Sequence, residues 1–501
     1  MSSGPTSTGR ADTRARDWPL VAVALPLIGV ALWRIAVFAA HVPIAAAFQH
    51  DYEEGNILNA LLRITRGSTP YPDPHVLPSI LNPYGPAAYY LLAVPAKLFG
   101  VTFFFPRLMI ICCTVAVAAV VAIEARRLNR SWILGVAFGF VFLAIPNIQQ
   151  WMWLLRVDLL GLAFTAAGLI VFSRELENHP ESPRTFIPAL LFAIAILVKP
   201  TLLAAPAACF TALVLRRDFR TAARLTLQTA AVFGGVLGAV AVATRGAVLT
   251  DIFLTHPDPF SFHVFTQGLT AMIVASWPLV LLAGVALARD VGARRFSPAV
   301  LWIVFATATA LTAGKLGSNS NHFVEWNAAL CIAAAAGLDE IRRAFRSSAA
   351  PAAALALIAI VLAIQPAFAT EPVNRDCAHA YESVRRESGD IISENVGALV
   401  LGGNKVWVSN PYVLAQLVEH SGWSDAALVE MVRERRFAAI YTHYDYVGIP
   451  AYLAHGTERA SPELLRAMAA NYAASPGFDC SDLAVVYRPK APAAIQSTQV
   501  R

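Results

Sequence analysis

Long apolar runs recur along this sequence, and they constrain its fold more than any other feature. Lipid cannot satisfy backbone polar groups, so apolar segments of this length cross a membrane as helices. Composition agrees, because 57% of the 501 residues are hydrophobic, 14% are charged and the mean hydropathy is +0.55. We therefore expect an α-helical polytopic membrane protein. The runs cover residues 18–40, 102–123, 132–146, 159–172, 225–243, 269–287, 300–313 and 352–368.

Clusters of arginine between the runs predict the topology, because short cytoplasmic loops are enriched in Lys and Arg. Keeping every cluster inside requires residues 186–198 and 201–215 to be two short spans hinged at Lys199-Pro200. Residues 87–99 then form an interfacial or re-entrant helix. The chain would cross about eleven times with its N-terminus in the cytoplasm. The clusters are Arg10/Arg14/Arg16, Arg126/Arg127/Arg130, Arg216/Arg217/Arg220, Arg289/Arg294/Arg295 and Arg342/Arg343/Arg346.

Three parts follow from this topology. Residues 1–17 form a cytoplasmic tail, residues 18–369 a transmembrane domain with an outer loop at 41–101, and residues 370–501 an extracytoplasmic domain. The first run is longer than the apolar part of a signal peptide, which favours an uncleaved anchor.

The last part is polar and mixed, and its patterns predict a small α/β domain with a partly parallel sheet. The expected strands are 398–402, 405–408, 438–442 and 483–487, and the expected helices are 413–420, 425–436 and 462–472.

The six cysteines divide between the exterior domain and the apolar runs. Cys377 and Cys480 bracket the exterior domain, and the other four lie in apolar runs. An oxidising exterior favours a disulfide between Cys377 and Cys480, with two unpaired thiols as the alternative.

Several classes of function are excluded. The net charge of +6 comes from arginines dispersed over cytoplasmic loops, which predicts no nucleic-acid partner. The sequence has no phosphate-binding loop, dinucleotide fingerprint, His-Glu-x-x-His or paired Cys-x-x-Cys motif, so we expect no cofactor.

The first outer loop concentrates acids at Asp51, Glu53, Glu54 and Asp73. A helix with Ile57, Leu58, Leu61 and Leu62 on one face would follow, lie on the membrane and stop at Gly67. Asp51 and Glu54 share a helix face and could act as a base and an orienting acid for a hydroxyl nucleophile. Alternatively, Asp51 is the N-cap of that helix and Glu54 completes a capping box.

Cations on the outer side run against the positive-inside rule. They could bind a lipid-linked phosphate, and Arg156 would pair with Asp158 at the interface. Snorkelling or simple ion pairing is the alternative for each of them. These cations are Arg63, Arg66, Arg156, Lys199, Arg245 and Lys315.

A polar turn at Asn321, His322 and Glu325 could bind sugar hydroxyls or could cap a helix. His256, Asp258 and His263 have weak metal-ligand spacing, and we expect no metal there.

Taken in order, these segments resemble the GT-C-type membrane glycosyltransferases, in particular the group of protein O-mannosyltransferases and aminoarabinose transferases (glycosyltransferase 39/83-like). The resemblance covers most of the chain. It rests on the acidic first loop followed by Gly67-Ser-Thr-Pro-Tyr-Pro-Asp73, Tyr84-Gly-Pro-Ala-Ala-Tyr-Tyr90, Leu98-Phe-Gly100, Arg156-Val-Asp-Leu-Leu160, Lys199-Pro-Thr201 and Asn321-His-Phe-Val-Glu325.

The resemblance implies inverting transfer from a polyprenyl-phosphate sugar to a glycan, lipid or protein hydroxyl at the outer face of a bacterial cytoplasmic membrane. A first-loop carboxylate would be the general base, and the exterior domain would help to hold the acceptor. The family usually has adjacent Asp-Glu, whereas this chain has Asp51-Tyr-Glu53-Glu54. Either Asp51 or Glu53 could therefore be the base; we favour Asp51, with Glu54 orienting the acceptor.

Roles for other residues follow from the same resemblance. Arg156, Lys199 and Lys315 are candidates for the donor phosphate. Sugar or acceptor contacts would come from Asp73, Tyr84, Asp158, Asn321, His322 and Glu325. The rival functions are a transporter or flippase for a lipid-linked or anionic solute, which should show internal repeats, and a non-catalytic assembly subunit.

Overall fold

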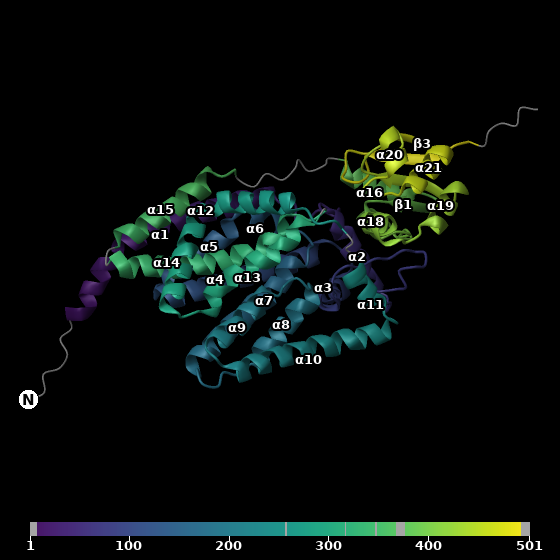
Figure 1. Cartoon of the computed structure of the whole chain (residues 1–501). Helices are drawn as coiled ribbons and strands as arrows, with labels where there is room; N and C mark the ends of the chain where they lie inside the picture. The colour runs from purple at the N-terminus through teal and green to yellow at the C-terminus, as the bar shows by residue number, and fades with distance from the viewer. Residues whose placement is uncertain (1–7, 256–257, 316, 346–347, 367–375, 492–501) are drawn as a thin grey trace, which may run out of the picture.

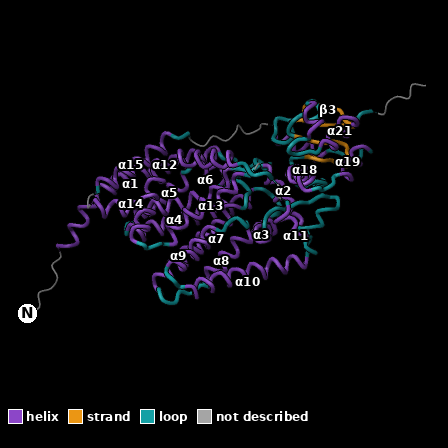
Figure 2. The backbone as a smooth tube through the Cα atoms, in the orientation of Figure 1, coloured by secondary structure: helices purple, strands orange, loops and turns teal. Residues whose placement is uncertain are grey.

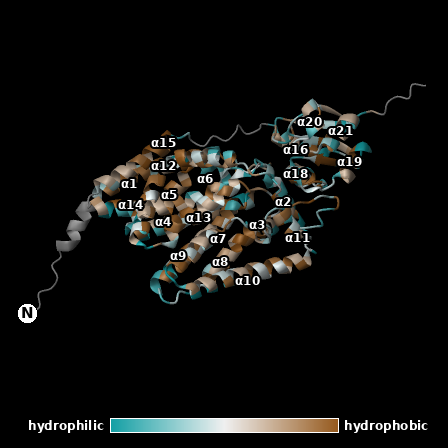
Figure 3. Ribbon diagram, viewed as in Figure 1, coloured by the Kyte–Doolittle hydropathy of each residue, from teal (hydrophilic) through white to brown (hydrophobic). Residues whose placement is uncertain are grey.

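The computed structural model describes residues 8–255, 258–315, 317–345, 348–366 and 376–491, with the side chains described from residue 18 onward. A bundle of helices occupies most of the molecule, and a smaller domain lies at one end of it (Figure 1). Among the described residues, strands lie in that domain alone (Figure 2). Hydrophobic residues dominate the helices of the bundle, as Figure 3 shows.

Five described helices are long and apolar enough to cross a membrane. Their apolar parts lie within α1 (Thr8–His41), α4 (Phe104–Asn129), α7 (Asp158–Asn178), α10 (Phe219–Ala243) and α12 (Phe262–Ala293).

Further helices complete the bundle: α5 (Trp132–Ala144), α8 (Phe186–Val198), α9 (Ala204–Leu215), α13 (Pro298–Thr309), α14 (Val324–Phe345) and α15 (Ala349–Ile364). The chain is a multi-pass membrane protein, and the number of about eleven spans stays a prediction. The predicted domain boundary at residue 369 lies outside the described residues.

Two features of the bundle follow directly from the sequence. The chain leaves α8 at Lys199, whose backbone is extended, because a residue before proline is disfavoured in the helical region. The predicted hinge at Lys199-Pro200 between two short helices is therefore confirmed. Helix α14 is the central helix, since its residues from Val324 to Asp339 are all buried and it packs on α12, α4 and α13.

Short elements connect the helices at the end that faces the smaller domain. They are α2 (Tyr52–Thr65), α3 (Pro86–Phe99), α6 (Pro146–Trp151), α11 (Ala247–Leu249), the π-helical turn η1 (Thr250–Leu254) and the 3₁₀ turns η2 (Ala310–Gly314) and η3 (Ser320–Phe323).

The C-terminal domain has a four-stranded sheet in the order β1-β2-β4-β3. Strands β1 (Asp390–Ser393) and β2 (Phe437–Thr442) are parallel, whereas β4 (Val485–Pro489) is antiparallel to β2 and to β3 (Tyr472–Pro476). The partly parallel sheet is confirmed. The domain helices are α16 (Cys377–Arg386), α17 (Val396–Gly402), α18 (Pro411–Ser421), α19 (Ala426–Arg433), α20 (Pro450–His455) and α21 (Pro462–Asn471).

The expected strands 438–442 and 483–487 correspond to β2 and β4, and the three expected helices correspond to α18, α19 and α21. A disulfide joins Cys377 to Cys480, with 4.8 Å between their Cα atoms. It is the pairing that the sequence favoured, and it ties the start of α16 to the segment before β4.

Two strand predictions are wrong. Residues 398–402 belong to helix α17, and 405–408 form no strand, since Val408 makes only an isolated bridge to Ser79. Asn395 caps α17 by accepting a hydrogen bond from the Ala398 amide, and Gly403 ends it in a left-handed conformation. Because residues 396–400 are all buried, their sequence has no polar face from which the period of a helix could be read.

The helix predicted after the first acids is α2, but its predicted position on the membrane is wrong. Ile57, Leu58 and Leu61 are fully buried, because α2 packs on α3 from one side and on α17 of the C-terminal domain from the other. Its apolar face is therefore covered by protein. This position puts the N-terminal turn of α2 at the junction between the two parts of the molecule.

Candidate active site between the membrane helices and the C-terminal domain

The N-terminal turn of α2 holds three of the predicted acids in different environments. Asp51 is the N-cap, and its carboxylate accepts a hydrogen bond from the Glu53 amide at 3.1 Å. Glu54 completes a capping box, as the alternative interpretation expected. Capping is not the only contact of the Asp51 side chain, because its Oδ1 also accepts a hydrogen bond from Arg156 at 2.9 Å. Capping and charge pairing therefore coexist in this turn.

Glu54 is buried in an ion pair rather than directed at a substrate. Arg107 of α4 donates from Nε and Nη2 to its two oxygens at 2.8 and 2.7 Å, and neither side chain is exposed. The amides of His50 and Leu155 also donate to it, each at 2.7 Å. Burial is the largest single effect and raises the pKa of Glu54, but Arg107 and the hydrogen bonds from the two amides together outweigh it, so the net pKa shift is downward. The predicted orienting role of Glu54 toward the acceptor does not fit this geometry.

A cavity of about 450 Å³ lies between the connections of the bundle and the C-terminal domain. Eight of the predicted site residues line it: Asp51, Glu53, Tyr84, Arg156, Lys199, Lys315, Asn321 and His322. They come from loops and helix ends that are far apart in the sequence. The cavity also includes Tyr52, Trp151, Asp258, Tyr412, Glu458 and Arg459, which were not assigned to the site from the sequence.

Two ion pairs form the inner wall of the cavity. Arg156 contacts Asp51 through Nη1, and Lys199 Nζ lies 2.5 Å from Oδ1 of Asp158. Asn321 donates to the same Asp158 oxygen at 3.0 Å. Asp158 itself lies behind the cavity wall, in a smaller polar annex that Lys199, Asn321, His322 and Glu325 also line. Each cation is thus held by a carboxylate while it faces the cavity.

Burial dominates the electrostatics of the two cavity acids. It raises the pKa of Asp51, and the opposing effect of Arg156 is smaller. It raises the pKa of Glu53 as well, although Arg156 and hydrogen bonds from Asn56 and Asn410 oppose the shift. A carboxylate with a raised pKa is a stronger base once it is ionised. Both acids therefore have the character that a general base needs.

Of the other predicted contacts, Asp73 lies away from the cavity and Glu325 lies in the annex, whereas His322 lines both the cavity and the annex. Asp73 is exposed and accepts a hydrogen bond from the His75 amide, so it is no part of the cavity. Glu325 accepts from Trp302 Nε1 at 2.8 Å. His322 shares a hydrogen bond of 2.7 Å with the Thr312 hydroxyl.

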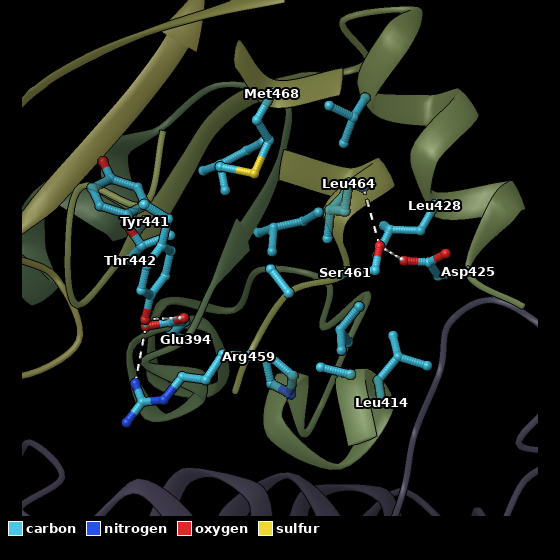
Figure 4. Close-up of a pocket in the computed structure, with 18 residues that line it drawn as sticks. Glu394, Leu414, Asp425, Leu428, Tyr441, Thr442, Arg459, Ser461, Leu464 and Met468 are labelled. Carbon is cyan, nitrogen blue, oxygen red and sulfur yellow. Dashed lines mark hydrogen bonds and ion pairs between the residues drawn. The ribbon is translucent and has the colours of Figure 1, made fainter. Parts of the chain in front are cut away.

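The C-terminal domain supplies the outer wall. Arg459 pairs with Glu394 at 3.0 Å and Asp482 at 2.7 Å, and its guanidinium lies over the Tyr52 ring. Figure 4 shows Arg459 reaching Glu394 beside an apolar pocket inside the domain. Arg459 lines both that pocket and the cavity. The sequence gives no local signal for this role, because every contact is between residues distant in the chain.

Further contacts join the domain to the bundle around the same cavity. Asn410 donates to Glu53 at 2.9 Å, and the Tyr412 hydroxyl donates to Asp258 at 2.8 Å. Gly317 has φ +76°, and a Cβ there would lie 2.0 Å from the Tyr412 hydroxyl oxygen. Glycine is therefore required where the α13–α14 connection meets the domain.

A closed apolar cleft, too narrow for a water molecule in this structure, adjoins the cavity on the side of α8 and α10. Pro200 and Ile252 line both spaces, and the cleft continues along Leu197, Phe233 and Leu237. Gly85 allows the close approach of the chain that makes this corner, since a Cβ there would lie 1.9 Å from the Leu197 carbonyl oxygen. Helix α10 lies at the edge of the bundle (Figure 1). A charged cavity therefore borders a closed apolar cleft beside α10.

Among the described residues, no group of three or more His, Cys, Asp and Glu side chains could hold a metal ion. His256, one of the weakly spaced ligand candidates, lies outside the described residues. Its neighbour Asp258 is engaged by Tyr412.

The sequence matches no protein-family model and no curated protein. Solved structures do resemble the fold. The aminoarabinose transferase ArnT from Cupriavidus metallidurans, bound to undecaprenyl phosphate, has a TM-score of 0.57 and 13% identity over 97% of this chain and 99% of that chain. The oligosaccharyltransferase AglB from Archaeoglobus fulgidus, in complex with an inhibitory peptide and a dolichol-phosphate, has a TM-score of 0.53 and 14% identity over 94% and 74%. The chain therefore has the GT-C fold that the sequence resemblance implied.

Proposed function

We propose that this protein is a glycosyltransferase that moves a sugar from a polyprenyl-phosphate donor to an acceptor hydroxyl at the outer face of the cytoplasmic membrane. The observation that carries the proposal is the junction of a charged cavity with an apolar cleft through Pro200 and Ile252. A polyprenyl-phosphate sugar needs both environments within a few bonds of each other. The apolar side chains of the cleft suit its first isoprene units, for which the cleft must widen, and the cavity suits the phosphate and the sugar.

The leaving group of this reaction is a polyprenyl phosphate, whose charge grows as the anomeric bond breaks. Arg156, Lys199 and Lys315 line the cavity and are the candidates to stabilise that charge. Arg156 and Lys199 are already oriented by Asp51 and Asp158, so they need little reorganisation when the donor binds.

Asp51 is the proposed general base. As the acceptor oxygen attacks the anomeric carbon, Asp51 takes the hydroxyl proton and the phosphate leaves with the bonding electrons. Glu53 is less suited, because Asn56 donates to one of its oxygens and Asn410 to the other. Inversion at the anomeric carbon follows from a single displacement. The acceptor would enter between α2 and the C-terminal domain, along Tyr412 and Glu458.

The neighbours support this chemistry by analogy, since ArnT was solved with undecaprenyl phosphate and AglB with a dolichol-phosphate and a peptide. The proposal places the N-terminus in the cytoplasm and the C-terminal domain outside, so that the donor headgroup and the disulfide share the oxidising side.

The test is turnover in proteoliposomes. Wild-type protein is supplied with labelled polyprenyl-phosphate hexoses and pentoses and with a cell-envelope extract as the acceptor source. We expect one donor to be consumed by the wild type and by Asp73→Asn, a matched acid outside the cavity, but not by Asp51→Asn. Equal consumption by all three proteins would remove Asp51 from the mechanism. Uptake of a labelled lipid-linked sugar without transfer would instead favour a flippase.

A further inference from the structure

Where the inner wall of the cavity meets the polar annex, buried hydrogen-bonding atoms lack a protein partner among the described residues; Arg156 lines the cavity, Asp158 the annex and Asn321 both. In the part of the chain that the structure describes, Nε of Arg156, Oδ2 of Asp158 and Oδ1 of Asn321 have no hydrogen-bond partner. The three side chains are nine-tenths or more buried, with 9%, 2% and 3% of their surface exposed. Buried polar groups in proteins are nearly always paired, so this gathering of unpaired atoms points to a ligand.

The hydrogen bonds that these three residues already make show which of their atoms are still available to a ligand. Asp158 uses Oδ1 for Lys199 and Asn321, and Arg156 uses Nη1 for Asp51. Nε of Arg156 and Oδ2 of Asp158 lie 3.9 Å apart, beyond hydrogen-bond distance. An atom between them must accept a hydrogen bond from Arg156 and donate one to Asp158.

Only one common substituent of a sugar meets both demands. A hydroxyl accepts and donates at the same oxygen. A phosphate oxygen would accept from Arg156 but would face the Asp158 carboxylate with like charge. An ammonium group would donate to Asp158 but would be repelled by Arg156. The geometry selects a neutral hydroxyl against either ion.

We propose that the boundary between the cavity and the annex binds one hydroxyl of the transferred sugar and so selects the donor by that hydroxyl. The inference rests on the proposed function, which does not say how the sugar of the donor is recognised, and it gives this region that role. The same Arg156 guanidinium contacts Asp51, so a sugar held here has its ring beside the general base. Arg156, Asp158 and Asn321 would then be specificity-determining residues of the donor subsite.

The test compares donors that differ at a single position. Each hydroxyl of the consumed polyprenyl-phosphate sugar is replaced in turn by hydrogen, fluorine and an amino group, and kcat/KM is measured with wild-type protein. We expect one position at which deoxygenation lowers kcat/KM about 10- to 100-fold. Fluorine at that position should not restore the rate, because it cannot donate to Asp158, and the amino group should not restore it either.

Protein variants then locate that hydroxyl. In Asp158→Asn, the fold loss of kcat/KM that deoxygenation of the donor causes (the penalty) should be at least about threefold smaller than in wild type, because the charged partner of the hydroxyl is gone. Asn321→Ala serves as the second variant if Asp158→Asn does not fold, and Asp73→Asn should keep the full penalty. A penalty unchanged in both annex variants, or no deoxy donor poorer than its parent, overturns the inference while the transferase function stands. If no donor is turned over by wild type, the proposed function fails and the inference fails with it.

Discussion

The ion pair between Glu54 and Arg107 gives the sharpest prediction about how the site is held. Glu54→Gln keeps the shape of the side chain but replaces one carboxylate oxygen with an NH₂ group and leaves the Arg107 charge without a buried partner. Because neither side chain is exposed, we expect a loss of about 3–5 kcal/mol in stability. The amides of His50 and Leu155 donate to this carboxylate, so the connections that carry Asp51 and Arg156 should also loosen.

The assay is thermal unfolding of purified protein in detergent, followed by tryptophan fluorescence. Glu54→Gln should melt well below the wild type, and the double variant Glu54→Met/Arg107→Met should melt above Glu54→Gln, since no buried charge remains unpaired. The double variant should still fall short of wild type, because Arg107 also donates to the carbonyls of Ala46 and Phe48. Asp73→Asn serves as the exposed control and should melt like the wild type.

The sign of the pH dependence supplies a second readout. The pKa of Glu54 is lowered in the folded protein, so its contribution to stability is present above the unfolded value of about 4.3 and is lost as the pH falls through the folded value. The melting difference between wild type and Glu54→Gln should therefore persist from pH 7 to about pH 5. Equal melting of the two proteins at pH 7 would refute this account of the buried pair.

Other consequences can be tested on the same preparations. The raised pKa of Asp51 predicts that kcat/KM rises with pH through a value above the usual aspartate value of about 3.9 and then levels off; a profile flat down to pH 4 would contradict this. Replacing Cys377 and Cys480 together by serine opens a loop of 103 residues and should lower the free energy of unfolding of the C-terminal domain by about 4 kcal/mol. Proteolysis of this domain should therefore be faster than in wild type, and an unchanged rate would contradict a stabilising role of the disulfide. Gly317→Ala should lower turnover, because its Cβ would displace Tyr412 from Asp258, whereas Gly67→Ala, which has a similar φ and open space around it, should have a smaller effect.

The sequence was sufficient for features that depend on local chemistry. Apolar length predicted membrane helices, and the arginine clusters and proline predicted the break at Lys199-Pro200. The Asp51 to Glu54 spacing offered a capped helix start as one of two alternatives, and the cap is present. Residues of separate loops were predicted to share a site, and eight of them, including five acids and cations, do line one cavity.

What escaped prediction depends on long-range packing. Nothing near Arg107 in the sequence indicates that it forms a buried ion pair with Glu54. Arg459 reaches the cavity only because the C-terminal domain packs on α2. The apolar face of α2, which was predicted to lie on the membrane, is instead buried where α2 packs on α3 and on α17 of the C-terminal domain. Similarly, α17 was mistaken for a strand because full burial removes the polar positions that would reveal its helical period.

The central claim is that Asp51, rather than Glu53, removes the acceptor proton. It is tested most directly by measuring donor affinity and turnover for Asp51→Asn and Glu53→Gln beside wild type. The account predicts that Asp51→Asn binds the polyprenyl-phosphate sugar about as tightly as wild type while its kcat falls by about 10²-fold or more, and that Glu53→Gln keeps a larger share of kcat. Near-normal turnover by Asp51→Asn, with turnover abolished in Glu53→Gln, would contradict it.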